Sequence, residues 1–106
     1  MSNYKDHLIL NSCKIKQALL KLNLLASDSI LFVVDDQNKL TGSLTDGDVR
    51  RGLIKGYNLK SSVKKVLNTK PITSKIHVDK NEAENILRKN DLIHLPLIEK
   101  KKLLRL

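Results

Sequence analysis

The chain has 106 residues, a formal net charge of +9 and 41% hydrophobic residues, which is the size and apolar content of one compact globular domain. A single cysteine, Cys13, excludes an intrachain disulfide and fits a reducing compartment, and no apolar run is long enough to cross a membrane. These features predict a cytoplasmic protein without a membrane partner, whose core is aliphatic because aromatic residues make up only 3%.

The first half of the chain predicts a helix, a strand, a second strand and a second helix. Residues 13–25 place apolar side chains at helical spacing. Residues 30–34 form a continuous apolar run of strand length, which predicts a strand buried on both faces. Residues 40–45 alternate as the second strand of a hairpin, and an amphipathic helix follows from about Asp46 until Gly56 ends it.

The second half predicts elements in a similar order. Residues 61–68 have the apolar spacing of a short helix. Asp79 and Glu82 have the spacing of a capping box and open a further helix. Residues 93–98 and residues 103–106 then predict two strands joined by a turn of lysines.

The two halves indicate a degenerate internal duplication. Each half has an amphipathic helix, an apolar strand that ends in an acid, a turn and a second strand. Ala83 stands 65 positions after Ala18, and Glu99 stands 64 positions after Asp35. Two such halves, packed through their sheets, would bury the aliphatic strands of both.

The sequence ILFVVDDQNKLTGSLTDGDVRRGL, residues 30–53, resembles the core of a CBS domain, the module named after cystathionine β-synthase. The family pattern is an apolar strand ending in Asp, a turn, and Gly-apolar-apolar-Ser/Thr-x-x-Asp where a strand meets a helix. Gly42, Thr45 and Asp48 match this pattern, whereas Ser43 stands where an aliphatic residue is usual.

The resemblance extends over nearly the whole chain as a tandem CBS pair. Residues 95–99 stand in the place of the common Leu-Pro-Val-Val-Asp of a second repeat. The resemblance implies an α+β fold in which residues 1–106 form one module of two pseudo-repeated βαββα halves with small sheets packed face to face. Residues 8–56 are the first repeat, and residues 61–106 are a second repeat that is truncated, because its motif would fall near position 109.

A narrower resemblance concerns residues 46–52, Asp-Gly-Asp-Val-Arg-Arg-Gly, together with residues 71–73. This short sequence is similar to that of the CBS pair found ahead of some sugar nucleotidyltransferase domains. The catalytic Gly-rich loop of such enzymes is absent from this sequence. The resemblance therefore implies a regulatory part that controls an attached enzyme and is not itself an enzyme.

The Thr45-x-x-Asp48 pair admits two interpretations. It is a helix cap, with Thr45 at the N-cap and Asp48 at the third helical position. It is also a candidate nucleotide site, because a helix start attracts phosphate, Gly47 permits close approach, and Arg50 and Arg51 could meet the phosphate. In CBS domains the Asp binds ribose hydroxyls and the Thr contacts ribose or phosphate.

The resemblance also implies an adenine pocket built from apolar backbone segments. Its candidate residues are Ser29, Ile30, Leu31, Ile72 and Thr73. The expected ligand is AMP, ADP, ATP or a related nucleotide, and no cofactor is required. His7 and His77 have no partners at metal-ligand spacing, so no metal site is predicted.

Two alternatives stay open. In the first, the chain is a CBS module that binds no ligand and forms a homodimer through its helices. In the second, it is a small nucleic-acid binder, because residues 49–106 carry fifteen Lys or Arg against five acids. The second is less favoured, because the lysines are scattered and lack interleaved aromatic residues for stacking.

Overall fold

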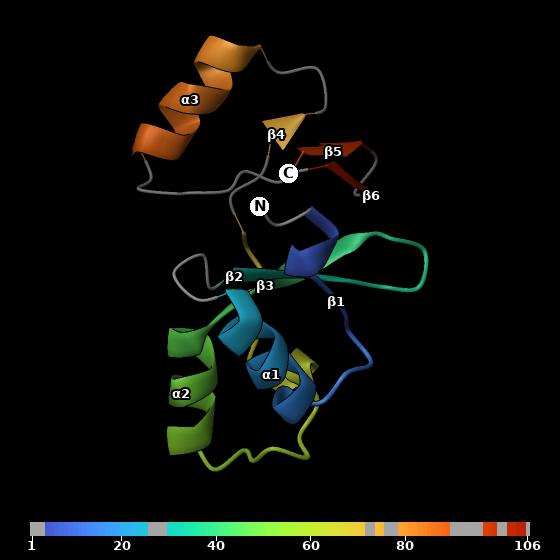
Figure 1. Cartoon of the computed structure of the whole chain (residues 1–106), viewed down its shortest axis with the longest axis vertical. Coiled ribbons are helices and arrows are strands. Elements are labelled where there is room, and N and C mark those ends of the chain that lie inside the picture. The colour runs from blue at the N-terminus through green and yellow to red at the C-terminus, as the bar shows by residue number, and fades with distance from the viewer. Residues whose placement is uncertain are drawn as a thin grey trace.

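The computed structural model describes residues 4–25, 30–71, 74–75, 79–89, 97–99 and 102–105. The fold is α+β, as predicted, with two small sheets and helices outside them (Figure 1). Its elements are η1 (Tyr4–His7), β1 (Leu8–Leu10), α1 (Ile15–Leu25), β2 (Ile30–Val34), β3 (Leu40–Thr45), α2 (Asp46–Ile54), η3 (Val63–Lys65), β4 (Ser74–Lys75), α3 (Lys80–Lys89), β5 (Leu97–Glu99) and β6 (Lys102–Arg105), where η denotes a 3₁₀ helix. None of the helices in these ranges has the length and apolar character needed to span a membrane.

The first sheet has the order β1-β2-β3. Strand β1 runs parallel to β2, with Leu8 opposite Phe32, and β2 runs antiparallel to β3, with Ile30 opposite Thr45. The hairpin of β2 and β3 is the predicted one. The sequence did not predict β1, because three residues are too few to show a periodicity.

The second sheet repeats the first. Its order is β4-β5-β6, again a parallel pair followed by an antiparallel pair. The hairpin register shifts between Val33 and Val34 in the first sheet and between Leu97 and Ile98, 64 positions later, in the second. Helix α3 begins 65 positions after α1. The pairing therefore has the period that the sequence predicted for the internal repeat.

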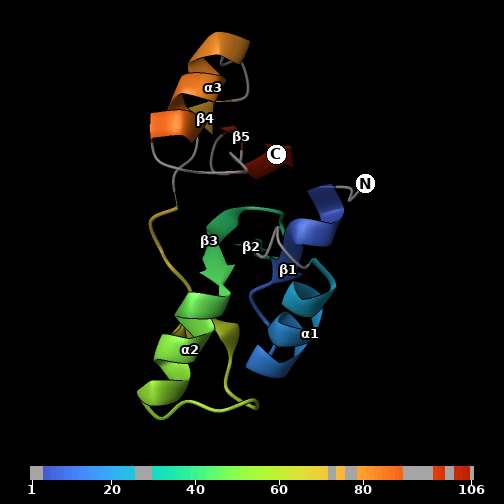
Figure 2. The same ribbon diagram turned by 60° about the vertical axis from the view of Figure 1, so that its left-hand side comes forward.

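Strand β2 is buried on both faces, as its continuous apolar run predicted. On one face, Leu31 and Val33 pack with α1 and α2 in the main core, whose buried members are Ile9, Ile15, Ala18, Leu22, Leu31, Val33, Leu44, Val49 and Val63. On the other face, Phe32 and Val34 form a second cluster with Leu8, Ile30 and Leu40. In both ribbon views the second sheet lies on the side of the first sheet that faces away from α1 and α2 (Figures 1 and 2).

The segment after α2 packs against the first half, with Val63 in the main core, and is mostly not helical. Gly56, at φ 108°, ends α2 as predicted. The predicted helix over residues 61–68 is wrong in its extent, because only the η3 turn forms. In place of helical hydrogen bonds, the backbone of this segment bonds to distant residues. Val63 N donates to Cys13 O over 3.0 Å, and Asn68 exchanges two hydrogen bonds of 2.8 and 2.9 Å with Ser43.

Candidate functional site

The junction of β3 and α2 is a complete capping box. Thr45 ends β3 in an extended conformation, with φ −120° and ψ 170°, and is the N-cap of α2. Its Oγ1 accepts a hydrogen bond from Asp48 N over 3.3 Å, and Asp48 Oδ2 accepts one from Thr45 N over 2.9 Å. The predicted cap is therefore confirmed, and it fixes the Asp48 side chain against the end of the strand.

Replacing Thr45 with alanine is expected to lower the free energy of unfolding by about 1 kcal/mol, because Asp48 N loses its side-chain acceptor. Thr45→Ser keeps a hydroxyl at the same position and is expected to retain most of the stability. Urea unfolding followed by circular dichroism measures both variants. An equal loss in the serine variant would assign the effect to the threonine methyl group and not to the cap.

The Asp48 carboxylate accepts hydrogen bonds on both of its oxygens. Oδ2 accepts from Thr45 Oγ1 over 3.1 Å, in addition to its bond from Thr45 N. Oδ1 accepts from Arg51 Nη2 over 2.6 Å, which forms an ion pair one turn along α2. The Asp48 side chain is 15% exposed, whereas the Arg51 side chain is 65% exposed. The carboxylate is thus largely enclosed, and its arginine partner is largely in solvent.

The two arginines of α2 are placed differently from each other. The Arg51 guanidinium folds back over Gly47, where a Cβ atom would lie 3.2 Å from Arg51 Nη1. Arg51 therefore lies beside the first turn of the helix, but in this structure its partner is Asp48. Arg50 is exposed. Of the two, Arg51 is the cation that the structure places beside the helix start, where phosphate was expected.

The candidate adenine segment is described only in part. Ile30 lies opposite Thr45 in the β2-β3 ladder, so the start of β2 is next to the capping box. The Leu31 side chain is buried in the main core, which leaves only its backbone for an outside ligand. The remaining predicted residues, Ser29, Ile72 and Thr73, lie outside the described residues.

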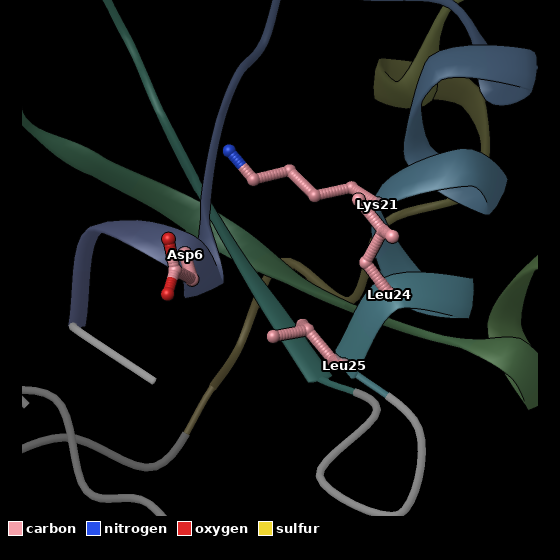
Figure 3. Close-up of a pocket in the computed structure, with 4 residues that line it drawn as sticks. All are labelled: Asp6, Lys21, Leu24 and Leu25. Carbon is pink, nitrogen blue, oxygen red and sulfur yellow. The ribbon is translucent and has the colours of Figure 1, made fainter. Parts of the chain in front are cut away.

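A pocket of about 300 Å³ opens between η1 and the end of α1, and the sequence did not predict it (Figure 3). Asp6 lies on its η1 side, and Lys21, Leu24 and Leu25 line it from α1. The spacing of these three residues marks one face of a helix, but nothing in that spacing distinguishes a pocket wall from an ordinary surface. None of the described residues that line the pocket belongs to the Thr45–Asp48 site.

His7 has a structural role in the fold. His7 is buried, and its Nδ1 lies 2.9 Å from the carbonyl oxygen of Ile30, which ties η1 to the start of β2. Within the described ranges, no group of three or more His, Cys, Asp or Glu residues could hold a metal ion. His77 lies outside those ranges.

Solved structures of other proteins share this architecture. CBSX2, solved in complex with AMP, is 21% identical with a TM-score of 0.77, covering 99% of this chain and 83% of that one. AcuB from Vibrio cholerae is 18% identical with a TM-score of 0.77, covering 93% of this chain and 74% of that one. These neighbours are CBS-domain proteins. The chain has the fold of a CBS domain.

Other matches cover only part of a longer protein. The cytosolic domain of the Mg²⁺ channel MgtE, solved in complex with ATP, is 20% identical with a TM-score of 0.71, covering 92% of this chain and 40% of that one. An uncharacterized protein of Helicobacter pylori strain J99 is 44% identical over 64 residues, which are 60% of this chain and 19% of the relative. The match thus spans about a fifth of that relative. No family model matches the sequence.

Proposed function

We propose that this chain is a regulatory CBS module that binds an adenine nucleotide, or a related nucleotide, where β3 meets α2. The capping box carries the proposal, because it holds the Asp48 carboxylate beside the start of a helix. A carboxylate accepts hydrogen bonds from the hydroxyls of ribose, and a helix start with adjacent cations attracts phosphate. Both the ribose and the phosphate of a nucleotide would therefore find complementary groups within one turn of α2.

The proposal assigns a role to each predicted residue of the site. Asp48 takes the ribose, Thr45 contacts ribose or phosphate, and Gly47 lets the backbone approach the phosphate. Arg50 and Arg51 supply positive charge. The base would lie against the predicted apolar segments Ser29, Ile30, Leu31, Ile72 and Thr73, with Leu31 contributing backbone atoms only. The AMP and ATP complexes of CBSX2 and MgtE support an adenine nucleotide as the ligand.

The regulated partner is proposed to be an attached nucleotidyltransferase-type enzyme in the cytoplasm. The proposal of this partner depends on the sequence of residues 46–52, which is similar to that of CBS pairs ahead of such enzymes. The matched relative is about five times longer than the segment it shares with this chain, so a similar segment occurs there within a larger protein. We take residues 8–56 and 61–106 as the two repeats of the regulatory pair.

Calorimetric titration with AMP, ADP, ATP and CMP is expected to show saturable binding of at least one adenine nucleotide at millimolar ligand or below. Asp48→Asn is expected to weaken that binding about tenfold or more, because the ribose hydroxyls lose a charged acceptor. Asp46→Asn is the matched control, since Asp46 carries the same charge in the same helical turn and is exposed. The absence of binding by any nucleotide, or equal weakening by both variants, would contradict the proposal.

A ligand-free dimerisation module is the second candidate, and exposed apolar side chains favour it. Leu20 and Leu24 of α1 and Leu53 and Ile54 of α2 are exposed, on two helices that lie on the same side of the first sheet (Figure 2). A second copy that covered these helices would remove that apolar surface from water. A dimeric mass in light scattering together with no response to nucleotides would favour this candidate over the first.

A further inference from the structure

The acceptor capacity of Asp48 is nearly exhausted in this structure. A carboxylate offers about four lone-pair positions, two on each oxygen. The Thr45 amide and the Thr45 hydroxyl, at 2.9 and 3.1 Å, take both positions of Oδ2. Arg51 Nη2 takes one position of Oδ1. One position is therefore left for any further donor.

A ribose presents two adjacent hydroxyls, so Asp48 must offer two positions to bind both of them. Oδ2 can offer one only if Thr45 gives up a hydrogen bond, either the amide bond of the capping box or the bond from its part-buried hydroxyl. Oδ1 can offer two if Arg51 leaves. The second route disturbs only a side chain in solvent, because Arg51 is 65% exposed. The geometry therefore makes Arg51 the group that a ribose would displace.

The displaced guanidinium would already lie next to the proposed phosphate position. Its Nη1 lies over Gly47 in the first turn of α2. Phosphate is a strong bidentate partner for arginine, and the helix start favours phosphate at the same place. A phosphorylated ligand thus gives Arg51 a new anionic partner when it loses Asp48, whereas a ligand without phosphate gives it none.

Resting on the proposed function, we propose that Arg51 is a selectivity residue that exchanges its Asp48 partner for the phosphate of the bound nucleotide. The exchange makes binding depend on the phosphate, so that the site accepts nucleoside phosphates and disfavours the free nucleoside. Arg50 has no part in the exchange. It is exposed, and the partner of Asp48 Oδ1 in this structure is Arg51.

The test compares AMP with adenosine in calorimetric titrations of the unmodified chain, Arg51→Gln and the matched control Arg50→Gln. In Arg51→Gln, adenosine is expected to bind about two- to fivefold more tightly, which is the worth of releasing one exposed ion pair. AMP is expected to bind more weakly, so the preference for AMP over adenosine falls about tenfold. Arg50→Gln removes the same charge and is expected to weaken AMP slightly without any gain for adenosine.

Three outcomes separate this inference from the proposed function. AMP binding that requires Asp48, combined with equal behaviour of the two glutamine variants, overturns the role of Arg51 and leaves the nucleotide site intact. Weaker adenosine binding in Arg51→Gln also overturns it, since Arg51 would then assist the nucleoside. If the unmodified chain binds neither adenosine nor any of AMP, ADP, ATP and CMP, the proposed function fails and this inference falls with it.

Discussion

Gly52→Ala is expected to lower the free energy of unfolding by about 2 kcal/mol, although alanine is the better helix former. Gly52 lies buried within α2, and a Cβ atom there would collide with Val66 Cγ1 and lie 3.2 Å from Val66 Cβ. A valine side chain is stiff and is held by the packed segment after η3, so it cannot move aside at low cost. Urea unfolding of the variant and the unmodified chain measures the loss.

The same helix supplies the control. A Cβ atom on Gly47 would meet only the end of the flexible Arg51 side chain, so Gly47→Ala is expected to be neutral or slightly stabilising. Val66→Ala removes the colliding methyl groups. In that background, Gly52→Ala is expected to cost less unfolding free energy than it costs in the unmodified chain. A stabilising Gly52→Ala variant would show that Val66 is not held against α2.

Leu22→Ala is expected to have the largest effect, a loss of about 3 kcal/mol of unfolding free energy. Leu22 is 1% exposed and belongs to the main core between α1 and the first sheet. Truncation removes buried methyl groups and leaves a cavity, and both effects disfavour the folded state. Such a loss is a large fraction of the total stability of a domain of this size. Thermal and urea unfolding both report it.

Leu24→Ala is the matched control, because it makes the same substitution two residues along the same helix. Leu24 is 84% exposed, so truncation leaves no cavity and alanine favours the helix. The unfolding free energy of Leu24→Ala is expected to change by less than about 0.5 kcal/mol at low protein concentration. Equal losses in the two variants would contradict the orientation of α1 on the sheet.

The main elements of the fold could be predicted because their signals are local. The apolar run of residues 30–34 and the helical spacing of residues 13–25 each occur within one segment, and each predicted its element. The period of 64 to 65 residues in the helices and strand ends predicted the repeated sheet order. The three-residue strand β1 and the course of residues 61–68 depend on backbone pairing with distant residues, which local spacing does not record.

The sequence alone determined the cap of α2. Thr45 and Asp48 stand at the spacing of a cap where a strand meets a helix, and both bonds of the box are short-range. The i,i+3 spacing of Asp48 and Arg51 also permits their ion pair, which the structure contains. Only the tertiary structure decided the role of Gly52. From the sequence, Gly52 is only a residue with low helix propensity. Its role becomes visible when folding brings Val66, fourteen positions later, against it, because contacts between segments distant in sequence form only in the folded structure.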